Sequence, residues 1–272
     1  MAEDGGEVPR RSGIAQQFRE SSDYLQFIIA TLPLARGGNA EAQFYIATAM
    51  RFCRREYRAY FWDTRADRRR TLEQGLQHAA VTFGYSMTDA KEIFAKCDAL
   101  MQTDVSDFGN EEAWLAASAE GGYALAQVTY AQDLMLVQAA PLSDLPFASV
   151  YPQAGRREAL EYLHRAVRSK DPAVLWEIGQ MNWSGAQPDE ESEVRRWAWV
   201  LMACTRGADC SAQAPWTRYV CRFDPHCQPH EGTVDLIRRM AGGDFWRIEQ
   251  DARELSARLD ANDWSHLGLP EP

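Results

Sequence analysis

Two stretches of the chain share one pattern of small residues, and this pattern decides the fold class. The first, ARGGNAEAQFYIA, covers residues 35–47, and the second, AEGGYALAQVTYA, covers residues 119–131. Aligned without a gap, they carry the same residue at seven of thirteen positions. Each contains a Gly pair, and Gly readily adopts the left-handed conformation that ends many helices. The pattern predicts two equivalent helix–turn–helix corners, with Ala where paired helices approach each other.

Apolar residues recur with a helical period along most of the chain, and no stretch alternates as a strand does. The predicted N-caps are Asn39, Ser86, Asn110, Asp171 and Asp189. The predicted helices cover residues 24–35, 40–61, 69–84, 86–101, 111–120, 123–137, 158–170, 172–183, 188–207 and 244–260. Because one helical hairpin cannot bury its apolar face alone, the sequence predicts an all-α chain of stacked hairpins.

Composition bounds the class of protein. Apolar residues make up 46% of the 272 positions and include nine Trp, which is enough for a substantial core. No apolar run approaches the roughly 20 residues that span a bilayer. The formal net charge of −10 argues against general nucleic-acid binding, because a polyanion repels an acidic surface. We therefore expect neither a membrane span nor a nucleic-acid partner.

Composition and the helical pattern also predict the domain organisation. Residues 1–14 are rich in Gly and charge, and they are predicted to form a disordered tail. Residues 15–272 are predicted to form a single helical domain. Its C-terminal part is cysteine-rich over residues 204–230.

The repeated residues carry a resemblance to a known family. GNAEAQFYIA (38–47) and AEGGYALAQVTYA (119–131) resemble the Sel-one-like repeat, a relative of the tetratricopeptide repeat. AVRSKDPAVLWEIG (166–179) matches in part, whereas residues 48–108 match poorly. The resemblance implies a right-handed α-solenoid of stacked helical hairpins. Members of the family mostly bind other proteins and share no catalytic residues.

Six cysteines form an early pair and a later group of four. They are Cys53 and Cys97, then Cys204, Cys210, Cys221 and Cys227. In cysteine-rich secreted members of the similar family, a Cys near the end of one helix pairs with one at the start of the next. ACTRGADC (203–210) resembles that arrangement, which favours Cys204–Cys210. The grouping favours Cys53–Cys97 and leaves Cys221–Cys227; the main competing pair is Cys204–Cys221.

Other states of the cysteines stay open. Zinc held by Cys221, Cys227, His226 or His230 is one, although structural zinc sites usually space their ligands two to four residues apart. Six reduced, buried thiols are another. Disulfides indicate a periplasmic or secreted protein whose leader has been replaced by an initiator Met, and thiols or zinc indicate the cytoplasm. We expect the exported form, with no metal or other cofactor.

Residues 51–70 mix eight Arg with aromatic residues. One interpretation is a solvated Arg face on an amphipathic helix whose aromatics enter the core. The other is a binding face for an acidic partner, for which Arg54 and Arg58 are the candidates. Trp197 and Trp199 are two apart on a predicted helix, so they cannot face the same way. One of them is therefore a candidate for recognising a partner.

The sequence contains none of the common catalytic motifs, such as a Gly-rich phosphate loop, G-x-S-x-G or H-E-x-x-H. No catalytic or cofactor-binding residue is predicted. The resemblance to the Sel-one-like family implies non-enzymatic protein binding. Because proteins with these repeats include bacterial immunity proteins, its sharper form is an exported adaptor or immunity protein with a toxin or effector as the partner. The alternative is an enzyme, such as a hydrolase, whose site is assembled between helices.

Overall fold

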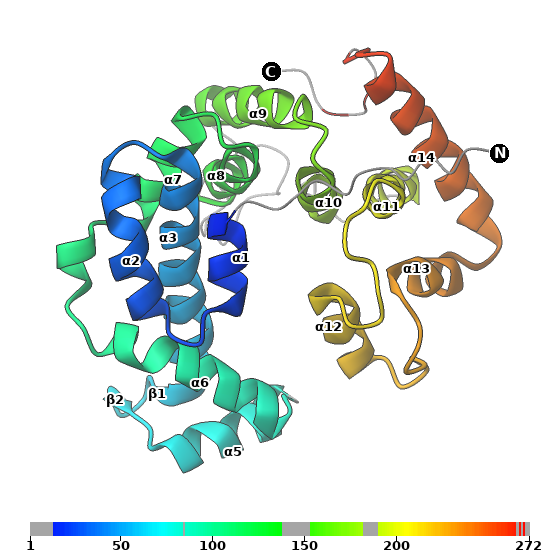
Figure 1. The fold of residues 1–272 in the computed structure, drawn as a ribbon. Coiled ribbons are helices and arrows are strands. Elements are labelled where there is room, and N and C mark those ends of the chain that lie inside the picture. The colour runs from blue at the N-terminus through cyan, green and yellow to red at the C-terminus, as the bar shows by residue number, and fades with distance from the viewer. Residues whose placement is uncertain are drawn as a thin grey trace. The chain divides into compact units, whose positions relative to one another are not determined.

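The chain is mostly helical over the residues that the structure, a computed structural model, describes: 13–83, 85–137, 153–181, 190–264, 267 and 269. This agrees with the predicted all-α class (Figure 1). The α-helices are α1 Gly13–Glu20, α2 Tyr24–Arg36, α3 Ala40–Phe52, α4 Arg58–Phe61, α5 Leu72–Phe83, α6 Met87–Met101, α7 Glu111–Glu120, α8 Ala124–Val137, α9 Gln153–Val167, α10 Pro172–Gln180, α11 Glu190–Thr205, α12 Pro215–Phe223, α13 Thr233–Ala241 and α14 Phe245–Asp260. Within this part of the chain, no helix is both long and apolar enough to cross a membrane.

Shorter elements interrupt the helices. A π-helix, η1 (Cys53–Tyr57), joins α3 to α4 without a break in the helical backbone. The strands β1 (Trp62–Asp63) and β2 (Arg68–Arg69) form a small antiparallel hairpin. Short 3-10 helices, η2 (Val105–Phe108) and η4 (Gly242–Asp244), precede α7 and α14.

The chain divides into two compact units, Met1–Gly121 and Gly122–Pro272, which we call the N-unit and the C-unit. A single domain over residues 15–272 stays a prediction, as does the solenoid arrangement. Most of the predicted tail, residues 1–14, lies outside the described residues. However, α1 begins at Gly13, so the last two residues of that range are helical.

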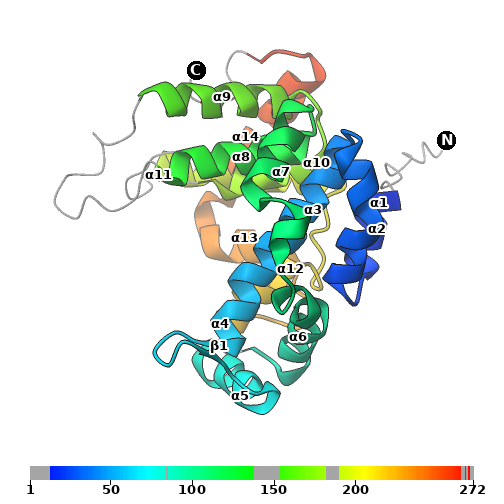
Figure 2. The same cartoon turned by 90° about the vertical axis from the view of Figure 1, so that its left-hand side faces the viewer.

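In the N-unit, α3 is the central helix and contacts α1, α2 and α7. Figures 1 and 2 both show α2 beside α3, with α5 and the β1–β2 hairpin near the end of the helix that α3, η1 and α4 form together. Aromatic rings fill the core below η1: Tyr57, Phe61 and Phe94 lie with ring centroids 5.0 to 6.1 Å apart. This packing buries large apolar surfaces and fixes η1 against α6.

The two small-residue corners adopt the same backbone conformation. Gly38 and Gly122 both have a φ of 86°, which L-residues with a side chain rarely adopt. The two corners also lie close to each other, because a Cβ added at Gly121 would lie 2.8 Å from the Cβ of Ala40. Ser118 donates to the Ala40 carbonyl at 2.6 Å from the same side of α7. The small residues therefore let α7 approach the start of α3 closely.

Most of the predicted helix starts are confirmed. Asn39, Ser86, Asn110 and Asp171 each accept hydrogen bonds from backbone N–H groups in the first turn of the helix that follows. Such caps satisfy donors that the helix itself leaves without partners. The predicted cap Asp189 lies outside the described residues.

In the C-unit, α8 packs against α9, and α10 and α14 both pack against α11. Contact between α10 and α11 is close, because a Cβ at Gly179 would meet Val200 at 2.7 Å. The fully buried Trp199 is the largest side chain of this core. The more amphipathic α12 and α13 follow at the cysteine-rich part of the chain, where no helix was predicted.

Candidate functional site

Arg54 and Arg58, the predicted partner-binding arginines, both line one groove of the N-unit. The groove has a volume of about 640 Å³. We call it the arginine groove. Its lining residues are Met50, Arg54, Arg58, Leu100, Met101, Thr103, Asp104, Ser106, Gly109, Asn110 and Glu111.

The π-helix explains why Met50, Arg54 and Arg58 share one side of a continuous helix. Residues four apart drift around an α-helix, because it has 3.6 residues per turn. The wider turn of a π-helix, with its i→i+5 hydrogen bonds, shifts the drift the other way. Since η1 covers Cys53–Tyr57, it partly cancels the drift between Met50 and Arg58. π-Turns of this kind occur often at functional sites.

Glu111 holds one of the two arginines from within the protein. Its carboxylate accepts from Arg54 Nη2 at 2.6 Å and lies 3.7 Å from Arg51 Nε. The Glu111 side chain is 6% exposed, whereas that of Arg54 is 55% exposed. Glu111 also begins α7, where the partial positive charge of the helix end favours a carboxylate. The buried carboxylate therefore orients Arg54 and leaves part of its guanidinium open to solvent.

Arg58 differs from Arg54 because no carboxylate pairs with it among the described residues. Its guanidinium carbon lies 5.9 Å from the ring centroid of Trp62, and its side chain is exposed. At a guanidinium exposed to solvent such a contact is weak, so it leaves the charge of Arg58 free to bind an anion. Arg58 is the available cation of the groove.

Apolar side chains complete the arginine groove. Leu100 and Met50 are buried, and Met101 is half-buried at the end of α6. Met side chains adapt to irregular partners, which suits a binding surface. The Cys53–Cys97 disulfide ties η1 to α6 and so joins the two sides of the groove, with a Cα–Cα distance of 5.2 Å.

The two carboxylates that line the groove have different partners. Hydrogen bonds from Ser106 lower the pKa of Asp104, so this group stays ionised at neutral pH. Glu111 is ion-paired to Arg54. The arrangement can bind a segment that offers an anion beside apolar groups.

The six cysteines lie in the three pairs that the sequence analysis favoured: Cys53–Cys97, Cys204–Cys210 and Cys221–Cys227. The zinc alternative would need thiolates from Cys221 and Cys227, whose sulfurs bond to each other here. Among the described residues no cluster of His, Cys, Asp and Glu could hold a metal ion. The pairing of the sulfurs thus supports the disulfide alternative for the six cysteines.

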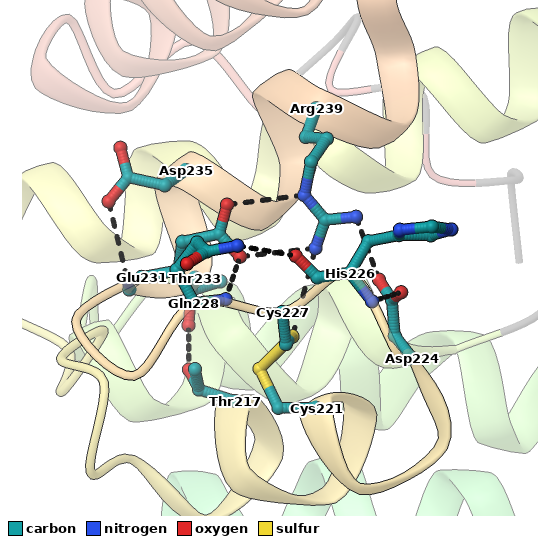
Figure 3. Close-up of a disulfide and its surroundings, with 11 residues drawn as sticks. Thr217, Cys221, Asp224, His226, Cys227, Gln228, Glu231, Thr233, Asp235 and Arg239 are labelled. Atoms are coloured by element: carbon teal, nitrogen blue, oxygen red, sulfur yellow. Dashed lines mark hydrogen bonds and ion pairs between the residues drawn. A yellow bond between two sulfur atoms is a disulfide. The ribbon is translucent and has the colours of Figure 1, made fainter.

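Figure 3 shows the third disulfide beside a charged network that holds its loop. Arg239 of α13 donates to Glu231 at 3.2 Å and pairs with Asp224 at 2.8 Å. The backbone N–H of His226 donates to Asp224, and that of Gln228 donates to Glu231. One arginine therefore fixes both ends of the loop that follows α12.

We expect the carboxyls of Asp224 and Glu231 to titrate below their usual range, in carboxyl-detected NMR spectra. Hydrogen bonds from the His226 and Gln228 N–H groups, and then from Arg239, lower both pKa values. Their stabilisation is therefore present above the ordinary carboxyl pKa and is lost as the pH falls through the lowered one. Arg239→Gln should return part of each shift. Unchanged titration in that variant would show that Arg239 does not hold the loop.

The two candidate tryptophans have opposite environments. Trp199 is fully buried, so Trp197 is the one of the two whose side chain reaches the surface. Trp197 is half-buried against Trp216, with ring centroids 5.7 Å apart, and Arg196 lies over its ring at 4.2 Å. Trp197 belongs to the C-unit, whereas Arg54 belongs to the N-unit.

Sequence reasoning missed much of the arginine groove. Glu111 is the first residue of the predicted helix 111–120, as observed, but its pairing with Arg54 was not predicted. Sequence reasoning assigned no role to Met50, Leu100 and Met101. A signal for the groove was present in the spacing of Arg54 and Arg58, four residues apart, which places both on one side of a helix.

The groove's residues come from several separate elements, so no single short motif records the groove. In the comparisons with known proteins, no protein-family model, curated protein or solved structure matches the chain.

Proposed function

We propose that the protein is a non-enzymatic, protein-binding helical module that docks an acidic segment of its partner in the arginine groove. The observation that carries this proposal is Arg58, an exposed cation without a carboxylate partner in the described part of the chain. It lies in one groove with Arg54 and with the apolar Met50 and Met101. A carboxylate flanked by apolar residues complements this surface in charge and in polarity.

The wider setting rests on the repeat resemblance and the cysteines. The Sel-one-like pattern supports a right-handed α-solenoid, and the matching corner geometry at Gly38 and Gly122 is compatible with such a repeat. Three cysteine pairs at bonding distance support an oxidising compartment, such as the periplasm or the exterior. Within that proposal, an immunity protein or adaptor that binds a toxin or effector is the sharper form.

The test uses charge reversal at the proposed contacts. A pull-down with the wild-type chain first identifies the partner, whose affinity is then measured by calorimetry with each variant. Arg54→Glu together with Arg58→Glu should weaken the complex by at least tenfold, because each loses a charge-assisted hydrogen bond. The loss should shrink as salt is raised, since exposed charges are screened.

Arg55→Glu is the matched control. Arg55 is 83% exposed and neighbours Arg54, but it does not line the arginine groove. This variant should bind as the wild type does. Equal loss of affinity in the control would indicate a general charge effect, and unchanged affinity in the double variant would contradict the proposed docking site.

A further inference from the structure

A second cavity of the N-unit, separate from the arginine groove, is lined mostly by hydrogen-bond donors. It has a volume of about 390 Å³ and lies between the β1–β2 hairpin and α5. We call it the hairpin cavity. Its lining residues are Asp63, Arg68, Arg70, Gln74, Gln77, His78, Val81 and Thr82.

The arginine side chains of the hairpin point alternately to its two faces. Successive strand side chains point to opposite faces, so Arg69 points away from Arg68 and Arg70. Arg69 is fixed on its own side, because its Nε donates to the Tyr57 hydroxyl at 2.7 Å and its Nη2 pairs with Asp98. Anchoring Arg69 in this way directs Arg68 and Arg70 together toward the cavity.

Arg70 is a rigid donor. Its Nη1 donates to the carbonyl of Tyr60 at 3.0 Å and to that of Trp62 at 2.6 Å. These bonds hold the guanidinium plane while no described acceptor binds Nη2 or Nε. Arg68 is exposed and lies directly opposite Asp63 in the hairpin. The guanidinium groups therefore supply several donors in a partly preorganised frame.

The donors from α5 face the same cavity. Gln74 uses its Oε1 to accept from the Thr71 N–H, which leaves its amide NH₂ as the free end. His78 shares a hydrogen bond of 3.1 Å with Thr82 through Nδ1, so Nε2 is the ring atom that remains for a ligand. Val81, 81% exposed, adds an apolar edge. Gln77 contributes a further amide.

The charges leave a positive surplus. Arg68 and Arg70 carry two positive charges, and Asp63 carries one negative charge. The Asp63 carboxylate is already engaged, because it accepts from the N–H groups of Arg65 and Ala66. Burial and then the charge of Arg70 lower the pKa of His78, so the imidazole is neutral at neutral pH. The cavity thus has one net positive charge and more donors than acceptors.

We propose that the hairpin cavity binds the oxyanion group of a small molecule, a phosphate or a carboxylate. Guanidinium and amide donors around one positive charge match the oxygen atoms of such a group. The volume exceeds that of a bare phosphate, so the rest of the molecule has room beside Val81. This site does not depend on the arginine groove.

The experiment titrates the full-length, disulfide-bonded chain with inorganic phosphate, and in a second arm with citrate, at constant ionic strength. Constant salt is needed because screening alone changes exposed charges. The readout is the His78 ring signal in NMR spectra, assigned with a His78→Asn variant. A saturable shift is expected, and the arm with the lower dissociation constant identifies phosphate or carboxylate as the preferred group.

Three variants test the site: the first should weaken binding, the second should tighten it and the third should leave it unchanged. Arg68→Gln should weaken binding about tenfold, because it removes a charge-assisted bond. Asp63→Asn should tighten binding, since it removes the competing negative charge while its amide oxygen still accepts from the turn. Arg65→Gln is the control, an exposed arginine of the same hairpin outside the cavity lining, and should bind as the wild type does.

These outcomes decide the proposal. Non-saturable shifts in both arms, or equal affinities for wild type, Arg68→Gln and Asp63→Asn, would overturn it. Far-UV circular dichroism on each variant separates a lost site from a lost fold. A variant that is misfolded is set aside, and the remaining one still tests the sign of its effect.

Discussion

Replacing both Cys53 and Cys97 by Ala should lower the free energy of unfolding of the N-unit by about 4 kcal/mol. The cysteines are 44 residues apart in the sequence. In the chain-entropy account, a cross-link of this span removes a large share of the unfolded chain's freedom, about 4 kcal/mol at 25 °C. Both side chains are fully buried, so Ala is preferred to Ser, whose hydroxyl would be buried without a partner.

A matched control exists in the same chain. The Cys204–Cys210 pair spans six residues, so its removal should cost about 2 kcal/mol by the same relation. Each double variant removes two sulfur atoms and the bond between them. The two pairs differ in loop length and also in burial, because Cys53 and Cys97 are fully buried and Cys204 and Cys210 are half-buried. Urea denaturation followed by circular dichroism compares them. Equal losses would contradict the entropic account, and no loss for Cys53 and Cys97 would show that this disulfide does not hold the N-unit.

The same variant links stability to the proposed function. Cys53 lies in η1 and Cys97 lies in α6, and both elements border the arginine groove. Without the bond, the two sides of the groove can separate more easily, so partner affinity should fall as well. In the variant, amide hydrogen exchange should be faster than in the wild type over residues 53–61 and 97–101. In α8 the exchange rates should change less.

Local signals in the sequence predicted the helices well. Asn39 and Asn110 each stand before a helix and accept from its first N–H groups, as their side chains favour. Gly38 and Gly122 mark the helix ends for an equally local reason, their positive φ. Such features are decided by two or three neighbouring residues, which is why a sequence alone reveals them.

Other elements depend on distant contacts and were missed. The strands of the hairpin are two residues long, too short to show an alternation, and Arg69 is held by Tyr57 and Asp98 from other elements. The π-helix η1 likewise has no side-chain pattern of its own. The tertiary structure, and not local propensity, fixes these elements.

The candidate site divides in the same way. Arg54 and Arg58 were found because charge and spacing are visible in the sequence. Their partner Glu111 lies 57 residues from Arg54, and only the packing of α7 against α3 brings it close. The choice between Trp197 and Trp199 also needed the structure. The helical period predicts that the two side chains point in different directions, but not which of them is buried.

Gly75→Ala should destabilise the N-unit by about 1 to 3 kcal/mol, although Ala is the better helix former. Gly75 lies within α5, where a Cβ would approach Cδ1 of Phe61 to 1.9 Å. Phe61 is fully buried and packed against Tyr57 and Phe94, so its ring has no free space into which it can move. Gly13→Ala is the control, because a Cβ at that helical position meets nothing within 4 Å.

A double variant tests whether the Phe61 ring causes the loss. Phe61→Leu alone should destabilise the core, since it removes buried ring atoms. Combined with Gly75→Ala, it should cost less than the sum of the two single variants, because the shorter side chain leaves space for the new Cβ. Strictly additive losses in denaturant titrations would show that the ring contact is not the cause. Gly75 would then be explained by some feature of α5 other than its approach to α4.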